Sequence, residues 1–286
     1  MSSSQNDRCT LPHQPIAAVI ADIDGTLVDS HKQLTPRAIR AVAALDAAGI
    51  AFSLASSRPP VGFGPLVQAL HLRAPLAAFN GGTLVQPNLR TVLRSCPMPA
   101  QQAQRALDML AQRGIDAWLF SRGEWCLTRP DGPYIDLERR TIGAEPRVLS
   151  RFDDLSSVDK LVGVSADFET LARAEHEMQG ALSPHLTVAR SQQYYLDITD
   201  PAANKGEAVR GLSQALGIAT ARIAVLGDMR NDVPMFKAAG FAIAMGQAEP
   251  FVREAAHCVT ASNDDEGFAK AIEQWILPNA APRNSD

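Results

Sequence analysis

The N-terminal part of the chain alternates short apolar runs with stretches of helical spacing. Three runs are rich in Ala, Val, Ile and Leu and end in polar residues: Ile16–Ile23, Ile50–Ala55 and Leu76–Phe79. Such runs are typical of strands buried on both faces of a parallel sheet. Between them, residues 38–48 follow the helix start Thr35-Pro36, and residues 65–70 have helical spacing. This β-α-β-α-β order predicts a doubly wound parallel sheet.

The last third of the chain repeats this order. A helix, two strands and a closing helix are predicted over 202–216, 222–226, 241–245 and 267–276. Asn231 is expected to cap one more helix, which runs through Ala239.

The middle of the chain has a different pattern. Two helices and four short strands are predicted there: 100–113 and 168–182, then 118–120, 160–165, 186–189 and 194–198. We therefore expect an α/β protein with a Rossmann-like core of residues 15–83 and 198–278. A smaller inserted α/β cap would span residues 84–197, between the two parts of the core. Residues 1–14 are predicted to form a disordered tail, and residues 279–286 a second tail.

Composition narrows the functional classes. The 286 residues carry 27 Lys and Arg against 31 Asp and Glu, so the net charge of −4 gives no basic footprint for nucleic acid. Four scattered cysteines (Cys9, Cys96, Cys126 and Cys258) suggest neither a zinc site nor a disulfide scaffold. No signal peptide and no run of membrane-spanning length are evident. We expect a cytoplasmic protein without nucleic-acid or membrane partners.

Two carboxylates close the first predicted strand. Asp22 and Asp24 lie two positions apart, so strand alternation points them the same way, at the edge where open α/β sheets bind ligands. Such close carboxylates repel each other unless a proton or a cation lies between them. Mg²⁺ would relieve that repulsion. The alternative is a turn in which Asp and Gly only cap the next helix.

A second acidic pair follows a later strand. Asp228 and Asp232 stand in Gly227-Asp228-Met229-Arg230-Asn231-Asp232, beside a predicted helix start. Helix capping explains this pair in isolation. Four acids at one sheet edge favour a bound cation, because each pair at 4 Å would repel by about 4 kcal/mol near a protein surface.

Further polar residues follow the predicted strands and the insert. The Lys205 ammonium could pair with both a carboxylate and a phosphate, although an isolated Lys is usually a surface charge. Ser56 offers a hydroxyl and a backbone N–H to phosphate oxygens, or caps a helix. Arg58 could hold substrate, but a structural ion pair is the simpler reading. Asn80, before Gly81-Gly82, is either a turn residue or a substrate contact.

With these motifs in view, the chain resembles the haloacid dehalogenase superfamily of phosphohydrolases. The resemblance rests on D-x-D-G-T-L at 22–27, Ser56, Lys205 and G-D-x-x-N-D-x-x-M at 227–235, in the family's order. The insert, Asn-Gly-Gly at 80–82 and Asn-Lys-Gly at 204–206 resemble the Cof-type (IIB) subgroup, which carries an α/β cap. The match covers nearly the whole chain, and the combination of motifs is highly specific.

The resemblance implies a Mg²⁺-dependent phosphatase. Asp22 would be the nucleophile that forms an aspartyl-phosphate, and Asp24 would protonate the leaving alcohol and then activate water. Ser56 and Lys205 would hold the phosphoryl oxygens. Mg²⁺ would be bound by the Asp22 side chain, the Asp24 carbonyl oxygen and the Asp228 side chain.

The resemblance also implies supporting residues. Asp232 would support the metal through a second layer of contacts or through water, and Asn231 would position its loop. Ser57, Arg58, Asn80 and Gly81 complete the expected phosphate and substrate site. Relatives commonly have Gly where Ser57 stands, so Ser57 would be strained if its φ is positive. Met229 and Arg230 stand where relatives usually have a small residue, which puts the pocket's shape and charge in doubt.

Two alternatives to a phosphatase remain at this level. One is a phosphomutase on the same core, and the other is a non-catalytic phosphate-binding or regulatory protein. A phospho-accepting receiver also uses acids, a hydroxyl and a Lys, but it is shorter and has no cap. The intact Asp24 also speaks against a pure binder.

The expected substrate is a small phosphorylated metabolite. Sugar phosphates come first by analogy with the subgroup, ahead of pyridoxal, flavin or nucleotide phosphates. Specificity would come from polar cap residues, for which the candidates are Arg122, Glu124, Arg129, Lys160, Gln192 and Tyr194.

Overall fold

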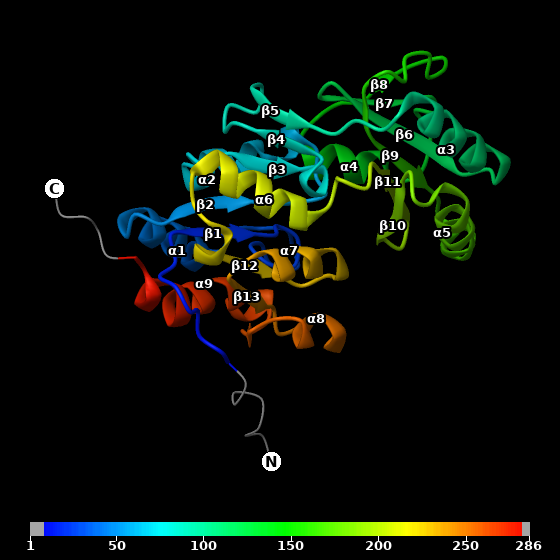
Figure 1. The fold of residues 1–286 in the computed structure, drawn as a ribbon. Helices are drawn as coiled ribbons and strands as arrows, with labels where there is room; N and C mark the ends of the chain where they lie inside the picture. The colour runs from blue at the N-terminus through cyan, green and yellow to red at the C-terminus, as the bar shows by residue number, and fades with distance from the viewer. Residues whose placement is uncertain (1–8, 282–286) are drawn as a thin grey trace.

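The computed structural model describes residues 9–281. Its central feature is a five-stranded parallel sheet in the order β14-β13-β12-β1-β2 (Figure 1). The strands are β1 (Ala18–Ala21), β2 (Ala51–Leu54), β12 (Ile223–Gly227), β13 (Phe241–Ala244) and β14 (Cys258–Val259). The core helices are α1 (Pro36–Ala47), α2 (Gly64–Leu70), α6 (Lys205–Leu216), α7 (Val233–Ala238), α8 (Pro250–Glu254) and α9 (Gly267–Ala271).

The sheet is covered by helices on both faces, which confirms the predicted doubly wound fold. Alternate residues of β1 divide between two apolar clusters. Val19 and Ala21 share one cluster with residues of α1 and α9. Ala18 and Ile20 share the other with residues of α6 and α7. Because every β1 side chain is buried, the strand reads as an unbroken apolar run.

A second, three-stranded sheet follows β2. β3 (Leu76–Ala78), β4 (Thr83–Val85) and β5 (Val92–Ser95) are antiparallel, and β3 meets the parallel sheet only through the bridge Ala55↔Ala77. The third strand of the predicted β-α-β-α-β unit is therefore present but pairs mainly with β4. The reason is the turn at Asn80, where the chain reverses direction and places β4 antiparallel to β3.

The inserted part forms a six-stranded sheet in the order β10-β11-β9-β6-β7-β8. Its strands are β6 (Asp116–Ser121), β7 (Glu124–Leu127), β8 (Arg147–Val148), β9 (Val158–Val164), β10 (Thr187–Gln192) and β11 (Tyr195–Thr199). Helices α3 (Ala100–Gln112) and α5 (Phe168–Leu182) share an apolar cluster with one face of this sheet. α4 (Ile135–Ile142) lies where the two parts meet, against the short helix η1 (Pro60–Phe63) (Figure 1).

Several element boundaries differ from those predicted. α6 begins at Lys205 rather than at residue 202, because the Asn204 side chain caps it by accepting a hydrogen bond from the Glu207 N–H. Asn231 caps no helix. It lies inside the short helix η4 (Arg230–Asp232), and its side chain donates to Asn80 instead. The closing helix α9 continues as one π-helical segment, Ile272–Ile276.

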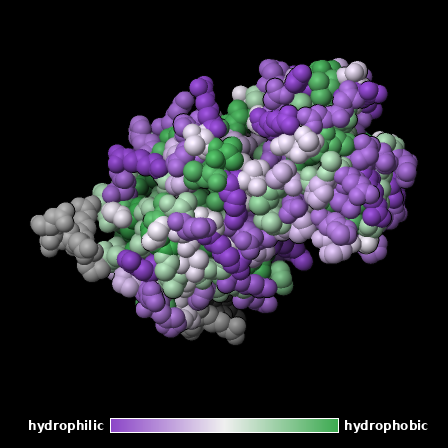
Figure 2. Space-filling view, turned by 45° about the horizontal axis from the view of Figure 1, so that its top comes forward, coloured by the Kyte–Doolittle hydropathy of each residue, from purple (hydrophilic) through white to green (hydrophobic). Residues whose placement is uncertain are grey.

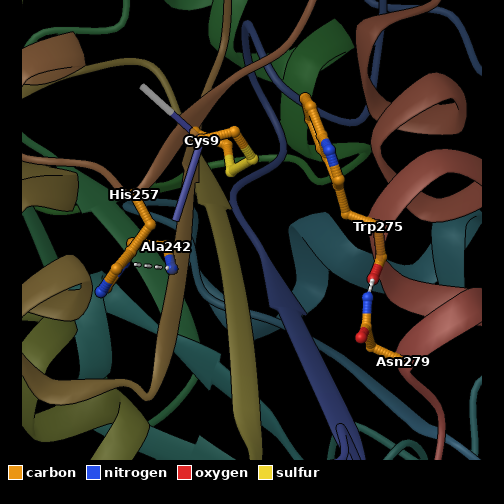
Figure 3. The surroundings of a disulfide bond; sticks show 6 residues. Cys9, Ala242, His257, Trp275 and Asn279 are labelled. Carbon is orange, nitrogen blue, oxygen red and sulfur yellow. Dashed lines mark hydrogen bonds between the residues drawn. A yellow bond between two sulfur atoms is a disulfide. The ribbon is translucent and has the colours of Figure 1, made fainter. Parts of the chain in front are cut away.

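The N-terminal segment is bound to the edge of the core sheet. A disulfide joins Cys9 to Cys258 of β14 across 249 positions of sequence (Figure 3). The Thr10 N–H donates to the His257 carbonyl oxygen next to it. The expectation that the cysteines suggest no disulfide is therefore wrong, since two cysteines far apart in sequence meet only in the fold. Residues 1–8 and 282–286 of the two predicted tails lie outside the described residues.

The surface shows two lobes, and hydrophilic side chains cover most of the face drawn in Figure 2. Between residues 9 and 281, no helix has the length and apolar character needed to cross a membrane.

Candidate active site

Asp22 extends the central strand to the carboxyl edge of the core sheet. Its N–H donates to the Leu226 carbonyl oxygen at 3.0 Å, so the β1–β12 ladder fixes its position. The side chain is buried, and its Oδ1 lies 2.7 Å from the Nζ of Lys205.

Lys205 is the cation at the centre of the site. Its side chain is 1 % exposed and pairs with both Asp22 and Asp232, the latter at 2.5 Å. Burial works against the Lys205 charge, but the two carboxylates outweigh it and raise the pKa of the ammonium group. Lys205 is therefore charged at every physiological pH, as the sequence-based role requires.

Asp228 is oriented by the loop that follows β1. The Thr26 hydroxyl donates to its Oδ1 at 3.0 Å. Gly25 has φ +85°, and a Cβ there would lie 2.3 Å from Oδ2 of Asp228. A side chain at Gly25 would thus displace the carboxylate. The D-x-D-G-T motif therefore supplies two acids and also the Gly25 and Thr26 contacts that position Asp228.

Asp232 is fully buried and holds the loop before it. Its Oδ2 accepts hydrogen bonds from the N–H groups of Asp228 and Met229, each at 2.8 Å, and its Oδ1 faces Lys205. Both oxygens of Asp232 are therefore engaged by the protein. This agrees with the expectation that Asp232 supports the metal site indirectly rather than binding the ion with its own oxygens.

The carboxylates of Asp22, Asp228 and Asp232 offer oxygen atoms that all lie within 4.8 Å of one another. Burial raises the pKa of Asp22 against the opposing charge of Lys205, and the neighbouring acids raise it further. Burial and Asp232 raise the pKa of Asp228 to about 6. Within residues 9–281, Oδ2 of Asp22 and Oδ2 of Asp228 have no hydrogen-bond donor. The cluster has two oxygens left for a cation.

Asp24 points away from this cluster toward two cations. Arg58 binds it in a bidentate fashion, Nε to Oδ2 at 2.8 Å and Nη2 to Oδ1 at 2.7 Å, and Lys32 lies 2.8 Å from Oδ1. Burial opposes the charge on Asp24, but these cations outweigh it and lower its pKa to about 2. The simpler reading of Arg58 as an ion-pair residue is confirmed, and its partner is Asp24. The second cation on Asp24, Lys32, is not among the site residues predicted from the sequence.

Ser56 and its neighbours form the next wall. The Ser56 hydroxyl is buried, but its backbone N–H donates to the Ala77 carbonyl oxygen at 3.0 Å. The expected backbone N–H for phosphate is therefore already used, because the bridge to β3 takes it. Ser57 is absent from the described residues with positive φ, so the condition for backbone strain at Ser57 is not met.

Asn80 and Asn231 lie together at the edge of the site. Asn231 Nδ2 lies 3.2 Å from Asn80 Oδ1, which joins the turn after β3 to the loop after β12. Gly81, with φ +97°, packs against the start of α6, and a Cβ would lie 2.8 Å from Cβ of Ala208. This close approach brings the turn beside Lys205.

Few of the candidate cap residues face the core. Four of the six pair within the cap or are exposed: Arg122 with Asp154, Glu124 with Arg147, Arg129 with Asp116, and Gln192. Lys160 is buried, 2.6 Å from Asp197 Oδ2 and 3.3 Å from the Ser57 carbonyl oxygen. Tyr194 stacks on Tyr134, which the sequence did not single out.

The unusual pair Met229-Arg230 lies at the rim. Arg230 is bound to Glu249 at 2.8 Å and lies over the Phe251 ring, so its charge is directed toward α8. Met229 is 46 % exposed.

Comparisons with known proteins agree with this geometry. The profile of the haloacid dehalogenase-like hydrolases matches residues 19–272. Pyridoxal phosphate phosphatase YbhA of Escherichia coli is 27 % identical over 91 % of this chain and 98 % of its own length. The 5-amino-6-(5-phospho-D-ribitylamino)uracil phosphatase YwtE of Bacillus subtilis is 27 % identical over 90 % and 97 %.

Solved structures show the same fold. A haloacid dehalogenase-like hydrolase from Bacteroides thetaiotaomicron superimposes with a TM-score of 0.82 at 26 % identity, covering 91 % of this chain and 99 % of its own. The match spans the core, the acidic motifs and the inserted cap together. The chain therefore belongs to the haloacid dehalogenase-like hydrolases and is a phosphatase.

Proposed function

We propose that the protein is a Mg²⁺-dependent phosphomonoesterase that acts through an aspartyl-phosphate on Asp22. The observation that carries this proposal is the contact of Asp22 with Lys205 beside the carboxylate of Asp228. A buried Lys at this place neutralises an anionic nucleophile and leaves one of its oxygens available.

The acidic cluster fits Mg²⁺. Its donors are hard carboxylate oxygens, which Mg²⁺ prefers, and two of them lack a partner in the described part of the chain. Asp22 and Asp228 would hold the ion with the Asp24 carbonyl oxygen, while Asp232 fixes the loop. When bound, Mg²⁺ would neutralise charge on the transferring phosphoryl group.

In the first step, an Asp22 oxygen forms a bond to phosphorus as the bond from phosphorus to the leaving oxygen breaks. Asp24 would supply the proton that the leaving oxygen takes up, and would later accept one from the attacking water. The cations on Asp24 keep it ionised in this arrangement. Proton donation therefore requires Asp24 to leave Arg58 when substrate binds. Ser56, Lys205 and the Asn80–Asn231 pair would hold the phosphoryl oxygens.

The substrate is proposed to be a small phosphorylated metabolite. Resemblance to the subgroup favours sugar phosphates, whereas the names of the two relatives above specify phosphates of pyridoxal and of a substituted uracil.

The test is phosphate release from a panel of phosphorylated metabolites, with Mg²⁺ and with excess chelator. Asp22→Asn should lower kcat about a thousandfold or more, because the nucleophile loses its charge while keeping its size. Asp46→Asn, the same change at an exposed position of α1, is the matched control. Near wild-type rates in folded Asp22→Asn would refute the nucleophile assignment.

A further inference from the structure

The chain has three tyrosines, and the fold gathers all three at the junction of cap and core. Tyr134 and Tyr194 are stacked, with ring centroids 4.3 Å apart and planes 14° from parallel. Tyr195 meets both rings edge-on, at 4.6 Å from Tyr194 and 6.2 Å from Tyr134. We call these residues the tyrosine cluster. Its members come from the turn before α4 and from the β10–β11 hairpin, so only tertiary structure unites them.

The tyrosine cluster lies on the face of the cap sheet that looks toward the catalytic core. Leu196 and Ile198 of β11 pack in the cluster beneath α3 and α5, so Tyr195 and Asp197 point to the opposite face. On that face, Lys160 reaches the Ser57 carbonyl oxygen of the core. Burial raises the pKa of the Tyr194 hydroxyl, and the nearby groups of Tyr134, Glu138 and Asp24 raise this pKa further. Asp24, the proposed acid–base residue, is therefore a neighbour of Tyr194.

The backbone presents this cluster at some cost. Tyr134 has φ +63°, a left-handed conformation that a bulky residue rarely adopts, and its side chain caps no hydrogen bond of α4. Tyr134 and Tyr194 are only half-buried. In a stack of two rings, the outer face of each is not covered by the other.

A polar atom beside the tyrosine cluster lacks a partner. Oδ1 of Asp197 is buried without a hydrogen-bond donor among the described residues, whereas its other oxygen faces Lys160. Asp197 is 6 % exposed. The Tyr195 hydroxyl lies beside the Glu138 carboxyl group. Because buried polar atoms are nearly always hydrogen-bonded, Oδ1 of Asp197 points to a donor on a bound molecule.

We infer that the leaving group of the substrate is a planar aromatic ring that stacks on Tyr194. This inference rests on the proposed phosphatase function and adds the class of its substrate. Stacked aromatic rings attract each other by more than the burial of their surface area contributes. A substrate with an aromatic leaving group should therefore have a kcat/KM about fivefold higher than one with a saturated leaving group of the same size.

The test compares benzyl phosphate with cyclohexylmethyl phosphate, which differ in the aromaticity of one ring. The wild-type protein should prefer benzyl phosphate by about fivefold in kcat/KM. Tyr194→Leu should reduce this ratio to about one, whereas Tyr194→Phe should keep it, since the ring remains. Phe168→Leu, at an exposed aromatic residue on the outer helix α5, should also keep it.

Acetyl phosphate, which has no ring, separates the two proposals. Its turnover in Tyr194→Leu shows that the catalytic core is folded. A wild-type ratio of about one, or an unchanged ratio in Tyr194→Leu, overturns the inference while the phosphatase stands. If Mg²⁺-loaded wild-type protein hydrolyses a metabolite of the panel but none of these three compounds, the inference is overturned and the phosphatase stands. If it hydrolyses neither these compounds nor any metabolite of the panel, the proposed function fails, and the inference fails with it.

Discussion

Gly25 shows how closely the loops after β1 and β12 approach each other. It combines φ +85° with a position against the Asp228 carboxylate, and both features exclude a side chain. Lys205 lies in the same close packing, between Asp22 and Asp232. Single residues here set the positions of several charges, so small substitutions should have large effects.

Gly25→Ala should lower Mg²⁺-dependent kcat/KM by about a hundredfold, because the new Cβ displaces Asp228 by a fraction of an ångström or more. Gly114→Ala is the matched control, since Gly114 also has positive φ, +65°, but nothing lies within 4 Å of its Cβ position. Both variants should lose about 1 kcal/mol of stability to backbone strain. Steady-state kinetics and urea unfolding measure the two effects, and equal activities would contradict the explanation.

Asp24→Asn should slow both chemical steps, by about a hundredfold or more in kcat. The loss should be greater for benzyl phosphate than for p-nitrophenyl phosphate, whose leaving group needs no proton. Rapid-quench measurement of phosphoenzyme formation separates the steps. Unchanged kinetics, or an equal loss for both compounds in the first step, would remove Asp24 from acid–base catalysis.

At the level of elements, β14 is the edge strand of the core and carries the attachment of the N-terminal segment. Cys9 is joined to Cys258 by the disulfide (Figure 3), and the Thr10 N–H donates a hydrogen bond to the His257 carbonyl oxygen. His257 also accepts a hydrogen bond from the Ala242 N–H at Nδ1. The segment thereby covers part of a short strand pair, β13–β14, which has only two paired positions.

Cys9→Ser should lower the free energy of unfolding by about 2–4 kcal/mol, since the disulfide closes a long loop in the unfolded chain. Cys96→Ser, at a free cysteine, is the control. Urea unfolding with and without reductant measures the difference. A Cys9→Ser variant as stable as the oxidised wild type would show that the bond contributes nothing.

At the scale of the whole molecule, both polar and apolar contacts join cap and core. Lys160 of the cap contacts the Ser57 carbonyl oxygen, and α4 packs on η1. The acids that we propose as catalytic all come from the core, whereas the tyrosines that we propose to face the leaving group come from the cap. In this proposal, different parts of the chain carry the chemistry and the selectivity.

Mg²⁺ should stabilise the whole protein, by about 2.7 kcal/mol at a hundredfold excess over its Kd. Asp228→Asn should abolish this response. Without metal, the same variant should be at least as stable as wild type at pH 7. The pKa of Asp228 is raised to about 6 in the folded state, so its ionisation destabilises the fold as pH rises toward 6. Thermal melts measure both effects, and an unchanged Mg²⁺ response in Asp228→Asn would argue against the proposed site.

Much of the fold could be predicted because its signals are local. α5 was predicted over its observed range, 168–182, from helical spacing alone. α4, β7 and β8 were not predicted, since the Pro, Gly and charged residues of 122–150 resemble a loop until the cap sheet packs around them. The Ser56 backbone N–H was expected to be available, but its use by Ala77 depends on a strand that is distant in sequence.

The positions of the acidic groups could be predicted from the sequence, because acids that end buried parallel strands must share one edge of the sheet. Asp22 and Asp228 follow from that rule, whereas Lys205 was expected from its place in Asn-Lys-Gly after the insert. Packing of the fold was needed to bring Arg58 and Lys32 to Asp24, Cys9 to Cys258, and the three tyrosines together. These contacts depend on how separate elements pack against one another. The spacing of residues along the chain does not show which distant residues come into contact.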